Sequence, residues 1–290
     1  MRITRLVSRI ACGTALAWGT CLAGLSPALA AANDAASAQE AVEQAEGFIR
    51  KIKSGALVSM SDEQLIKTFA QLDPNLIPAY LELGVKPLNE YEFTMRRQER
   101  IDGSWNNDPF LNLVKYRHKP RQVYMTWLKG SAKGGQEIIY DETKRKDAMY
   151  GHLGGMFNIA SIWISLDGAK AKGNSNHPVS DVGLQTVVDI VSSSHKRRLK
   201  EGLPVAPGQI EVVKINGERC VALTWLAPAS VKGLYASKSK ICVDLKQPLI
   251  RQTESWDEAG QMFERISFDK VTPAAFTEAD FDPKNPAYDF

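Results

Sequence analysis

Cysteine is scarce in this chain of 290 residues, which holds four, two of them, Cys12 and Cys21, close to its start. The remaining pair, Cys220 and Cys242, is too small a set for a structural zinc site, because such sites usually take four ligands. Each lies in a strand-like run, and an even number of cysteines is typical of an oxidising compartment. We therefore predict a disulfide between neighbouring strands, worth roughly 3 kcal/mol in the chain-entropy model. The alternative is two buried free thiols.

An excess of either charge is also missing. The chain has 36 Lys and Arg against 33 Asp and Glu, and the segment 1–30 contains three Arg and no acid. Without that segment the positive and negative charges balance. Nucleic-acid binding predicts a clear basic excess, so we expect no nucleic-acid partner. The basic clusters at 115–121 and 195–198 are interpreted as a solvated strand edge and a helix C-terminus.

Complete catalytic and cofactor motifs are absent. The glycine-rich stretch 130–135 lacks the Lys and Ser/Thr that must follow the second spaced glycine of a phosphate-binding loop. Ser193 to Lys196 has the Ser-x-x-Lys spacing of penicillin-recognising enzymes, but their companion motifs are missing. No two of the four histidines lie within one helical turn. The sequence therefore predicts a non-enzymatic protein with no catalytic residue, no cofactor and no metal.

The longest apolar stretch lies at the start of the chain and has the pattern of an export signal. Arg2, Arg5 and Arg9 precede an uncharged run from Ile10 to Leu25, and Ala28-Leu29-Ala30 supplies a small-x-small cleavage pattern. The run is short for a membrane span, which needs about 20 residues. We predict a signal peptide over residues 1–30, export by the general secretion route to the periplasm, and no transmembrane segment in the mature chain.

Helical spacing follows the leader, over residues 31–88. Apolar residues recur every three or four positions between Ala38 and Ile52. Ser61, with Gln64 three residues later, predicts a capping box at the start of a second helix. Pro74 and Pro78 are expected to interrupt that helix.

From residue 89 the apolar period changes to two, which is typical of strands. Gly, Lys and Asp clusters separate the runs, and Asn216-Gly217 is a strong hairpin signal. A helix is predicted near 179–200. The expected strands are 89–101, 111–116, 121–128, 137–140, 146–152, 160–166, 210–215, 220–226, 234–244, 249–256 and 262–270.

These elements predict an α+β fold. It is a strongly curved antiparallel sheet, a half-barrel, with helices packed on its concave side and an N-terminal helical segment. The domains are a signal peptide at 1–30, the helical segment at 31–88 and the β domain at 89–290, which contains the inserted helix. The C-terminal tail holds four aromatic residues and is expected to pack back as a strap, because exposed aromatics are costly in water.

The sequence between Tyr91 and Tyr140 resembles a known family. The segments Glu99–Gly103, Lys115–Pro120, Val123–Trp127 and Gly135–Tyr140 are similar to those of the bacterial secreted proteins catalogued as domain of unknown function 1571. That family brings no known activity. The strand order and turn placement after Cys242 are also similar to the carriers and receptors of the Lol lipoprotein pathway. This likeness implies a half-barrel, closed by helices over an apolar cavity that takes acyl chains.

These features predict a periplasmic binding or carrier protein for a lipid, an acyl chain or a lipoprotein, with an envelope protein as a further partner. We expect the ligand-binding residues to be Tyr124, Trp127, Glu137, Tyr140 and His177. One alternative is an envelope hydrolase. Its candidate residues are Glu137, Asp141, His177 and Asp181. The other is a structural partner in an envelope complex.

Overall fold

A computed structural model describes residues 27–152, 160–173, 175–228 and 230–290, with side chains from residue 39 onward. The chain divides into two compact units, Met1–Gln39 and Glu40–Phe290. The predicted signal peptide lies outside the described residues except for 27–30, which begin helix α1 (Pro27–Lys53). Within the described ranges, no helix is long and apolar enough to cross a membrane.

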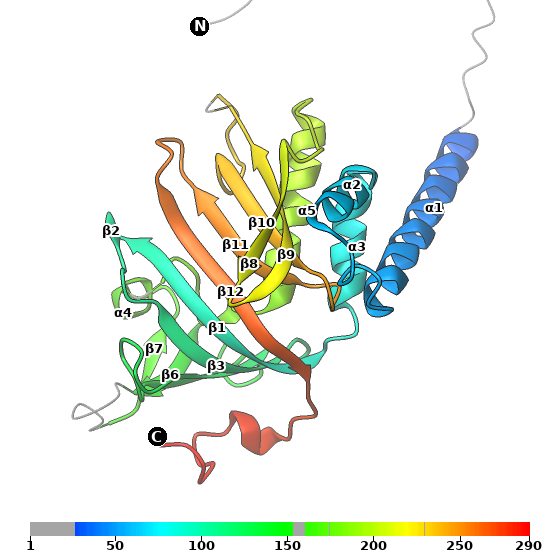
Figure 1. The fold of residues 1–290 in the computed structure, drawn as a ribbon. Coiled ribbons are helices and arrows are strands. Elements are labelled where there is room, and N and C mark those ends of the chain that lie inside the picture. Colours follow the sequence, from blue (N-terminus) through cyan, green and yellow to red (C-terminus); the bar gives the residue numbers. More distant parts are fainter. Residues whose placement is uncertain (1–26, 153–159, 174, 229) are drawn as a thin grey trace, which may run out of the picture. The chain divides into compact units, whose positions relative to one another are not determined.

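Two short helices follow α1 (Figure 1). Helix α2 (Asp62–Ala70) has the predicted capping box, in which the Gln64 backbone N–H donates to Ser61 Oγ at 3.2 Å and the Gln64 side chain accepts from the Ser61 N–H. Helix α3 (Leu76–Val85) contains Pro78 in its first turn, where a missing N–H costs nothing. Pro78 therefore does not interrupt a helix as predicted.

Twelve antiparallel strands form one sheet in the described part of the chain. The first meander runs from β1 to β7 and the second from β8 to β12, and pairing of β1 with β12 joins them. Strands β7 and β8 are the two ends of the hydrogen-bonded order, so the sheet is open, as a half-barrel requires. The strands are β1 (Glu90–Ile101), β2 (Ser104–Trp105), β3 (Phe110–Arg117), β4 (Gln122–Trp127), β5 (Glu137–Asp141), β6 (Ala148–His152), β7 (Ile162–Ser165), β8 (Gln209–Ile215), β9 (Glu218–Leu226), β10 (Lys238–Asp244), β11 (Ile250–Trp256) and β12 (Met262–Pro273).

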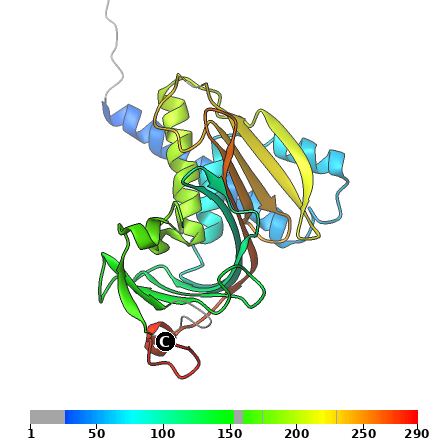
Figure 2. The ribbon, with the colours of Figure 1, turned by 90° about the vertical axis from the view of Figure 1, so that its left-hand side faces the viewer.

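The sheet curves around helix α5 (Leu184–Lys200), which lies on its concave side (Figure 2). A short helix α4 (Ala169–Lys172) and a 3₁₀ turn η2 (Val179–Asp181) precede α5 in the connection from β7. Tyr91 fixes the start of α5 to β1, because its hydroxyl accepts from the Leu184 N–H and donates to Gln185, both at 2.8 Å. Helix α3 packs against α5. The predicted α+β half-barrel is confirmed.

The convex side of β3–β5 is covered by the C-terminal tail, residues 274–290. The Tyr288 ring stacks on Tyr124 at 3.9 Å between centroids, and Phe281 is fully buried against the same face. The tail contains the 3₁₀ turn η3 (Glu278–Phe281). It therefore packs back as a strap, as its aromatic residues predict.

The two cysteines are not joined, which corrects the predicted disulfide. They lie on neighbouring strands, but Cys242 is opposite Ala222, and Cys220 is opposite Asp244. Diagonal positions of this kind are about 7–8 Å apart, beyond the reach of ordinary disulfide geometry. Burial raises the pKa of both thiols to about 12, so they pack as inert apolar groups.

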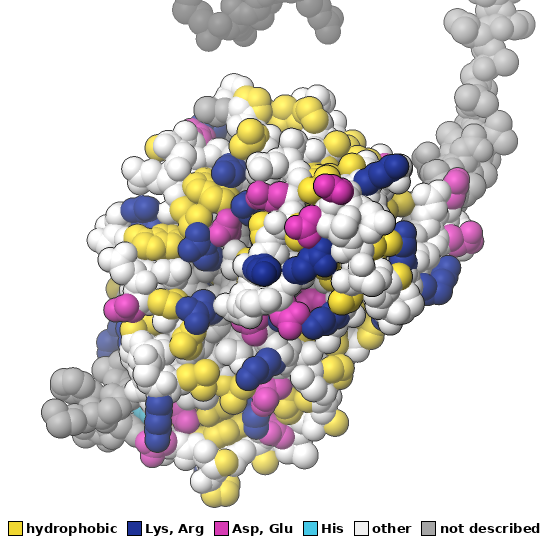
Figure 3. All heavy atoms as spheres, viewed as in Figure 1, with side chains coloured by type: hydrophobic (Ala, Val, Ile, Leu, Met, Phe, Trp, Pro, Cys, Tyr) yellow, Lys and Arg dark blue, Asp and Glu magenta, His cyan; other side chains and the backbone are white. Residues whose placement is uncertain are grey.

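The surface carries both charges in mixture. On the face that Figure 3 shows, Lys and Arg side chains lie among Asp and Glu side chains, without a large area of one sign. This arrangement agrees with the charge balance of the sequence.

Substitution of Gly84 by alanine is expected to destabilise the fold. A Cβ at this position of α3 would lie 1.9 Å from the Pro248 carbonyl oxygen in the turn between β10 and β11. We expect a loss of about 1–3 kcal/mol in the free energy of unfolding, as for other overpacked sites. Gly47→Ala in α1 is the matched control, because its Cβ would meet only the Arg50 side chain at 3.8 Å. That change should stabilise by about 0.5–1 kcal/mol. Urea unfolding measures both, and equal effects would contradict the packing of α3 against the turn.

Candidate functional site

A cavity of about 200 Å³ lies between the concave face of the sheet and helix α5. Its wall is mainly apolar, with three methionines that can adapt to an irregular ligand. The sheet and one side of α5 supply much of the wall, and α3, the connection from β7 to α5 and the loop before β10 supply the rest. The principal apolar residues are Met95, Met125, Trp127, Ile138, Met149, Ile266 and Phe268 from the sheet, and Val187, Ile190 and Val191 from α5.

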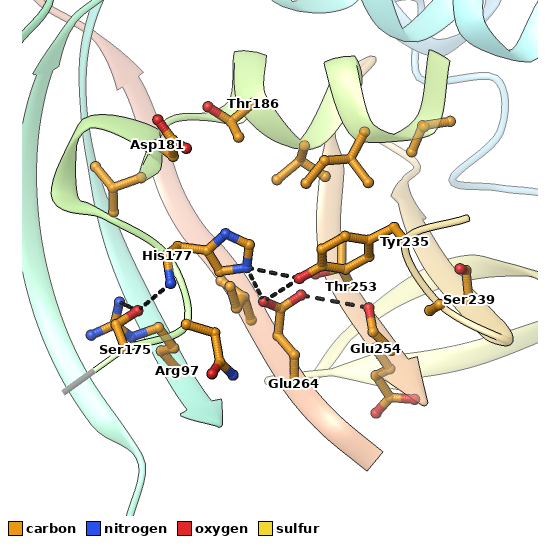
Figure 4. A pocket seen from close by; sticks show the side chains of 18 of the residues that line it. Arg97, Ser175, His177, Asp181, Thr186, Tyr235, Ser239, Thr253, Glu254 and Glu264 are labelled. Carbon is orange, nitrogen blue, oxygen red and sulfur yellow. Dashed lines mark hydrogen bonds and ion pairs between the residues drawn. The ribbon is translucent and has the colours of Figure 1, made fainter. Parts of the chain in front are cut away.

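Charged residues line the cavity at several places, and one group of polar and charged side chains surrounds His177 (Figure 4). We call the group the polar cluster; it consists of Arg97, Glu99, Ser175, His177, Tyr235 and Glu264. The register of β1 and β12 puts Glu99 directly opposite Glu264. Both carboxylates are buried, at 2% and 4% exposure. Like charges opposite one another on neighbouring strands are destabilising, and burial increases the cost. This pair therefore requires compensation from its neighbours.

Arg97 and the loop before His177 hold Glu99. Arg97 Nε lies 3.0 Å from Glu99 Oε2, and its Nη1 donates to Ser175 Oγ at 2.9 Å. The other carboxylate oxygen, Oε1, accepts from Ser175 Oγ at 3.1 Å and from the Asn176 N–H at 2.9 Å. Two donors therefore satisfy Oε1 of Glu99, while Oε2 has the ion pair with Arg97 but no hydrogen bond among the described residues.

Glu264 is held by His177 and Tyr235. Its Oε2 lies 2.5 Å from His177 Nε2 and accepts from the Tyr235 hydroxyl at 2.9 Å; the hydroxyl is itself 2.8 Å from Nε2 (Figure 4). Burial opposes protonation of His177, but the hydrogen bond and the charge of Glu264 outweigh it and raise the imidazole pKa. Burial and the same carboxylate raise the pKa of Tyr235, which keeps its proton. Ser255 Oγ also lies near this carboxylate, at 3.5 Å from Glu264 Oε1.

The structure brings only some of the predicted site residues together. Trp127 and His177 line the cavity, and so does Asp181. Tyr140 belongs to the main hydrophobic core and is not part of the cavity wall. The remaining two predicted ligand-binding residues, Tyr124 and Glu137, lie on the convex side.

The predicted residues on the convex side are engaged by the tail or by their own strand neighbours. The Tyr124 hydroxyl donates to Glu137 Oε1 at 2.9 Å, and the Asp289 N–H donates to Glu137 Oε2 at 2.9 Å. Asp141 accepts from Gln122 Nε2 at 2.9 Å. The hydrolase candidates therefore do not assemble with His177, apart from Asp181. Strand alternation explains the difference, since odd-numbered positions of β5 face away from α5.

Sequence reasoning missed Arg97, Glu99 and Glu264. A signal for the first two is present in β1, where the inward positions Tyr91, Phe93 and Met95 continue as Arg97 and Glu99. Charged residues at positions that alternation assigns to the interior are unusual, and a buried polar site is one reason for them. Glu264 has the same relation to Ile266 and Phe268 in β12. Their proximity to His177 could not be foreseen, because it depends on the β1–β12 pairing.

Solved structures with a similar architecture have low identity to this chain. Lipoprotein LppX of Mycobacterium tuberculosis has 15% identity and a TM-score of 0.38, with 71% of this chain and 99% of that one covered. A LolA superfamily protein from Nitrosomonas europaea has 9% identity and a TM-score of 0.30, with 73% of this chain and 98% of that one covered. The matching chain of the Pseudomonas aeruginosa MucA/MucB complex has 12% identity and a TM-score of 0.33, with 67% of this chain and 55% of that one covered. All three TM-scores are below 0.5.

Among curated proteins, no match to the sequence was found. A family model described as "Protein of unknown function (DUF1571)" matches residues 88–290. This range includes every strand of the sheet, helix α5 and the C-terminal tail. The match agrees with the family predicted from the sequence segments. The chain belongs to the DUF1571 family.

Proposed function

We propose that this protein is a non-enzymatic carrier of the cell envelope that holds a lipid, an acyl chain or the acylated end of a lipoprotein. The observation that carries the proposal is the apolar cavity between the concave sheet and α5. Ligand sites are typically concave and apolar, with a few polar groups placed to fix orientation. This cavity has both parts, a wall of aliphatic, aromatic and methionine side chains and one polar cluster.

The energetic basis is burial of apolar surface. Each methylene group that leaves water contributes about 0.8 kcal/mol, so about ten buried methylene groups match the free energy of micromolar binding before the cost of association is counted. The polar cluster then meets the head group. An amphiphile therefore matches the two kinds of wall better than a wholly polar metabolite does.

The envelope location rests on the predicted export signal. After residue 30 the chain has equal numbers of basic and acidic residues. This balance favours a partner that is recognised by apolar contacts over one that is recognised by charge. An envelope protein that delivers or receives the ligand is part of the proposal, since a carrier must exchange its cargo.

The direct test is titration of the delipidated protein with a fluorescent fatty-acyl probe. Saturable binding of one probe per chain, displaced by unlabelled fatty acid, is expected. Probe fluorescence that rises without saturation, or that the unlabelled fatty acid fails to displace, would reject the cavity as an acyl site.

A second candidate is an envelope hydrolase, because two carboxylates and a histidine lie within 4.8 Å of one another beside the cavity. Glu99, His177 and Glu264 are residue types that general acid–base catalysis uses. The two functions are distinguished by incubating the protein with an acyl ester and measuring how much of the ester stays intact. Recovery of the intact ester after long incubation favours the carrier. Cleavage that Glu264→Gln abolishes, while His195→Gln retains it, favours the hydrolase.

A further inference from the structure

We propose that Glu99, His177 and Glu264 form a binding site for a divalent metal ion of the Zn²⁺ class at the wall of the cavity. One ligand atom from each residue lies within 4.8 Å of the others, and the three side chains come from β1, β12 and the loop before η2. No metal site is expected from the sequence, because metal-ligand motifs are recognised by ligands that lie close together in the chain. Here the fold brings together three residues that are far apart in the sequence.

The donor set suits zinc. His nitrogen and carboxylate oxygen are common zinc ligands, at about 2.0–2.2 Å from the ion. Ligands at that distance in a tetrahedron lie roughly 3.3 Å apart. The three ligand atoms lie within 4.8 Å of one another, so adjustment of the side chains by about 1–1.5 Å brings them to this spacing.

His177, Tyr235 and Glu264 are in close contact with one another. The three distances between Nε2, the hydroxyl oxygen and Oε2 are 2.5, 2.8 and 2.9 Å. The imidazole nitrogen and the hydroxyl bring at most two protons to these three contacts. With the Tyr235 hydroxyl donating to Oε2, the Nε2–H is shared between the hydroxyl oxygen and Oε2. A metal ion that replaces this shared proton would accept one lone pair from Nε2 and one from Oε2.

The charges of the cluster also leave room for a cation. Arg97 is its one fixed positive charge and is already paired with Glu99. Among the described residues, Glu264 has His177 and Tyr235 as close partners, together with a long contact to Ser255. Two buried carboxylates therefore share one fixed positive charge and one histidine, which is a costly arrangement. A divalent ion between Glu264 and Glu99 removes that cost and the repulsion between the opposed strands.

The surroundings have two further properties of a metal site. Ser175 and the Asn176 N–H hold Glu99, and Ser255 contacts Glu264, so outer partners orient both carboxylates. His177, Tyr235 and Glu264 also line the cavity. The ion can therefore enter from the cavity and keep one coordination position open toward it.

The experiment is titration of the full chain with Co²⁺ and Zn²⁺ after treatment with a chelator and delipidation. Tetrahedral Co²⁺ reports its ligands by visible absorption, and calorimetry with Zn²⁺ gives stoichiometry and affinity. We expect one ion per chain in the wild type. His177→Gln and Glu264→Gln should each weaken binding by at least about tenfold. Circular dichroism confirms that each variant is folded.

His195→Gln is the matched control, because His195 lines the same cavity outside the cluster. Its affinity for Zn²⁺ should stay within about twofold of the wild type. Absence of stoichiometric binding in the wild type would overturn the proposal, and so would equal affinity in His177→Gln. The metal titration contains no lipid, so absence of metal binding would not count against the carrier proposal. In the same way, absence of acyl-probe binding would not count against a metal site.

Discussion

Replacing Val187 and Val191 with tryptophan should reduce affinity for the acyl probe by at least about tenfold. Both residues line the cavity from helix α5. Because the cavity is only about 200 Å³, two indole rings should occupy space that the ligand needs. Exclusion of two methylene groups from the cavity removes about 1.6 kcal/mol, which already exceeds a tenfold change. The fluorescent titration of delipidated protein measures the effect.

The control for this experiment is Ser193→Trp on the exposed side of the same helix. Ser193 is exposed and does not line the cavity. Its affinity should match the wild type, because the added ring points into solvent. If the double variant is folded and binds the probe as the wild type does, the acyl chain is bound somewhere other than the cavity.

Replacing Arg117 with methionine should lower the free energy of unfolding by about 2–3 kcal/mol. This buried side chain of β3 donates to Glu90 at 3.0 Å and to the Phe276 carbonyl at 2.7 Å. Hydrogen bonds to a charged group contribute about 1.5–3 kcal/mol each, and partial exposure of Glu90 reduces the sum. The contact with Glu278 adds little, because that carboxylate is 78% exposed. Urea unfolding measures the loss.

The same substitution should also release the tail from the convex face. Arg117 connects β3 to the start of the tail through the Phe276 carbonyl, its guanidinium lies 5.1 Å from the Phe281 ring centre, and Lys115 adds an ion pair to Asp280. Limited proteolysis should therefore cut the tail faster in Arg117→Met. Arg96→Met is the control, since Arg96 is exposed on β1. Equal stability and equal cleavage of the two variants would show that Arg117 does not fasten the tail.

The elements of this fold are encoded locally and could be predicted. Alternation in Tyr91, Phe93 and Met95 identifies β1, and the Ser61 capping box identifies α2. Asn216 and Gly217 both adopt positive φ in the hairpin between β8 and β9, as their residue types predict. Each of these features depends on residues close together in the chain.

The site depends on strand register and could not be predicted in the same way. A shift of one residue moves a side chain to the other face, and Tyr124 and Glu137 prove to lie beneath the tail. The same sensitivity explains the cysteines, which were placed on the correct strands but are offset along them. The pairing of Glu99 with Glu264 joins the first and the last strand of the sheet domain, which are far apart in the sequence. No local pattern encodes such a contact.

If the cavity holds a lipid, mass spectrometry of organic extracts of the purified protein will detect it. The protein is purified under gentle conditions from cells that make and export it. Its extract is compared with that of the Val187→Trp, Val191→Trp double variant. We predict about one lipid per chain from the wild type and little from the variant. A wild-type extract without stoichiometric lipid, or equal amounts from both proteins, would contradict the account.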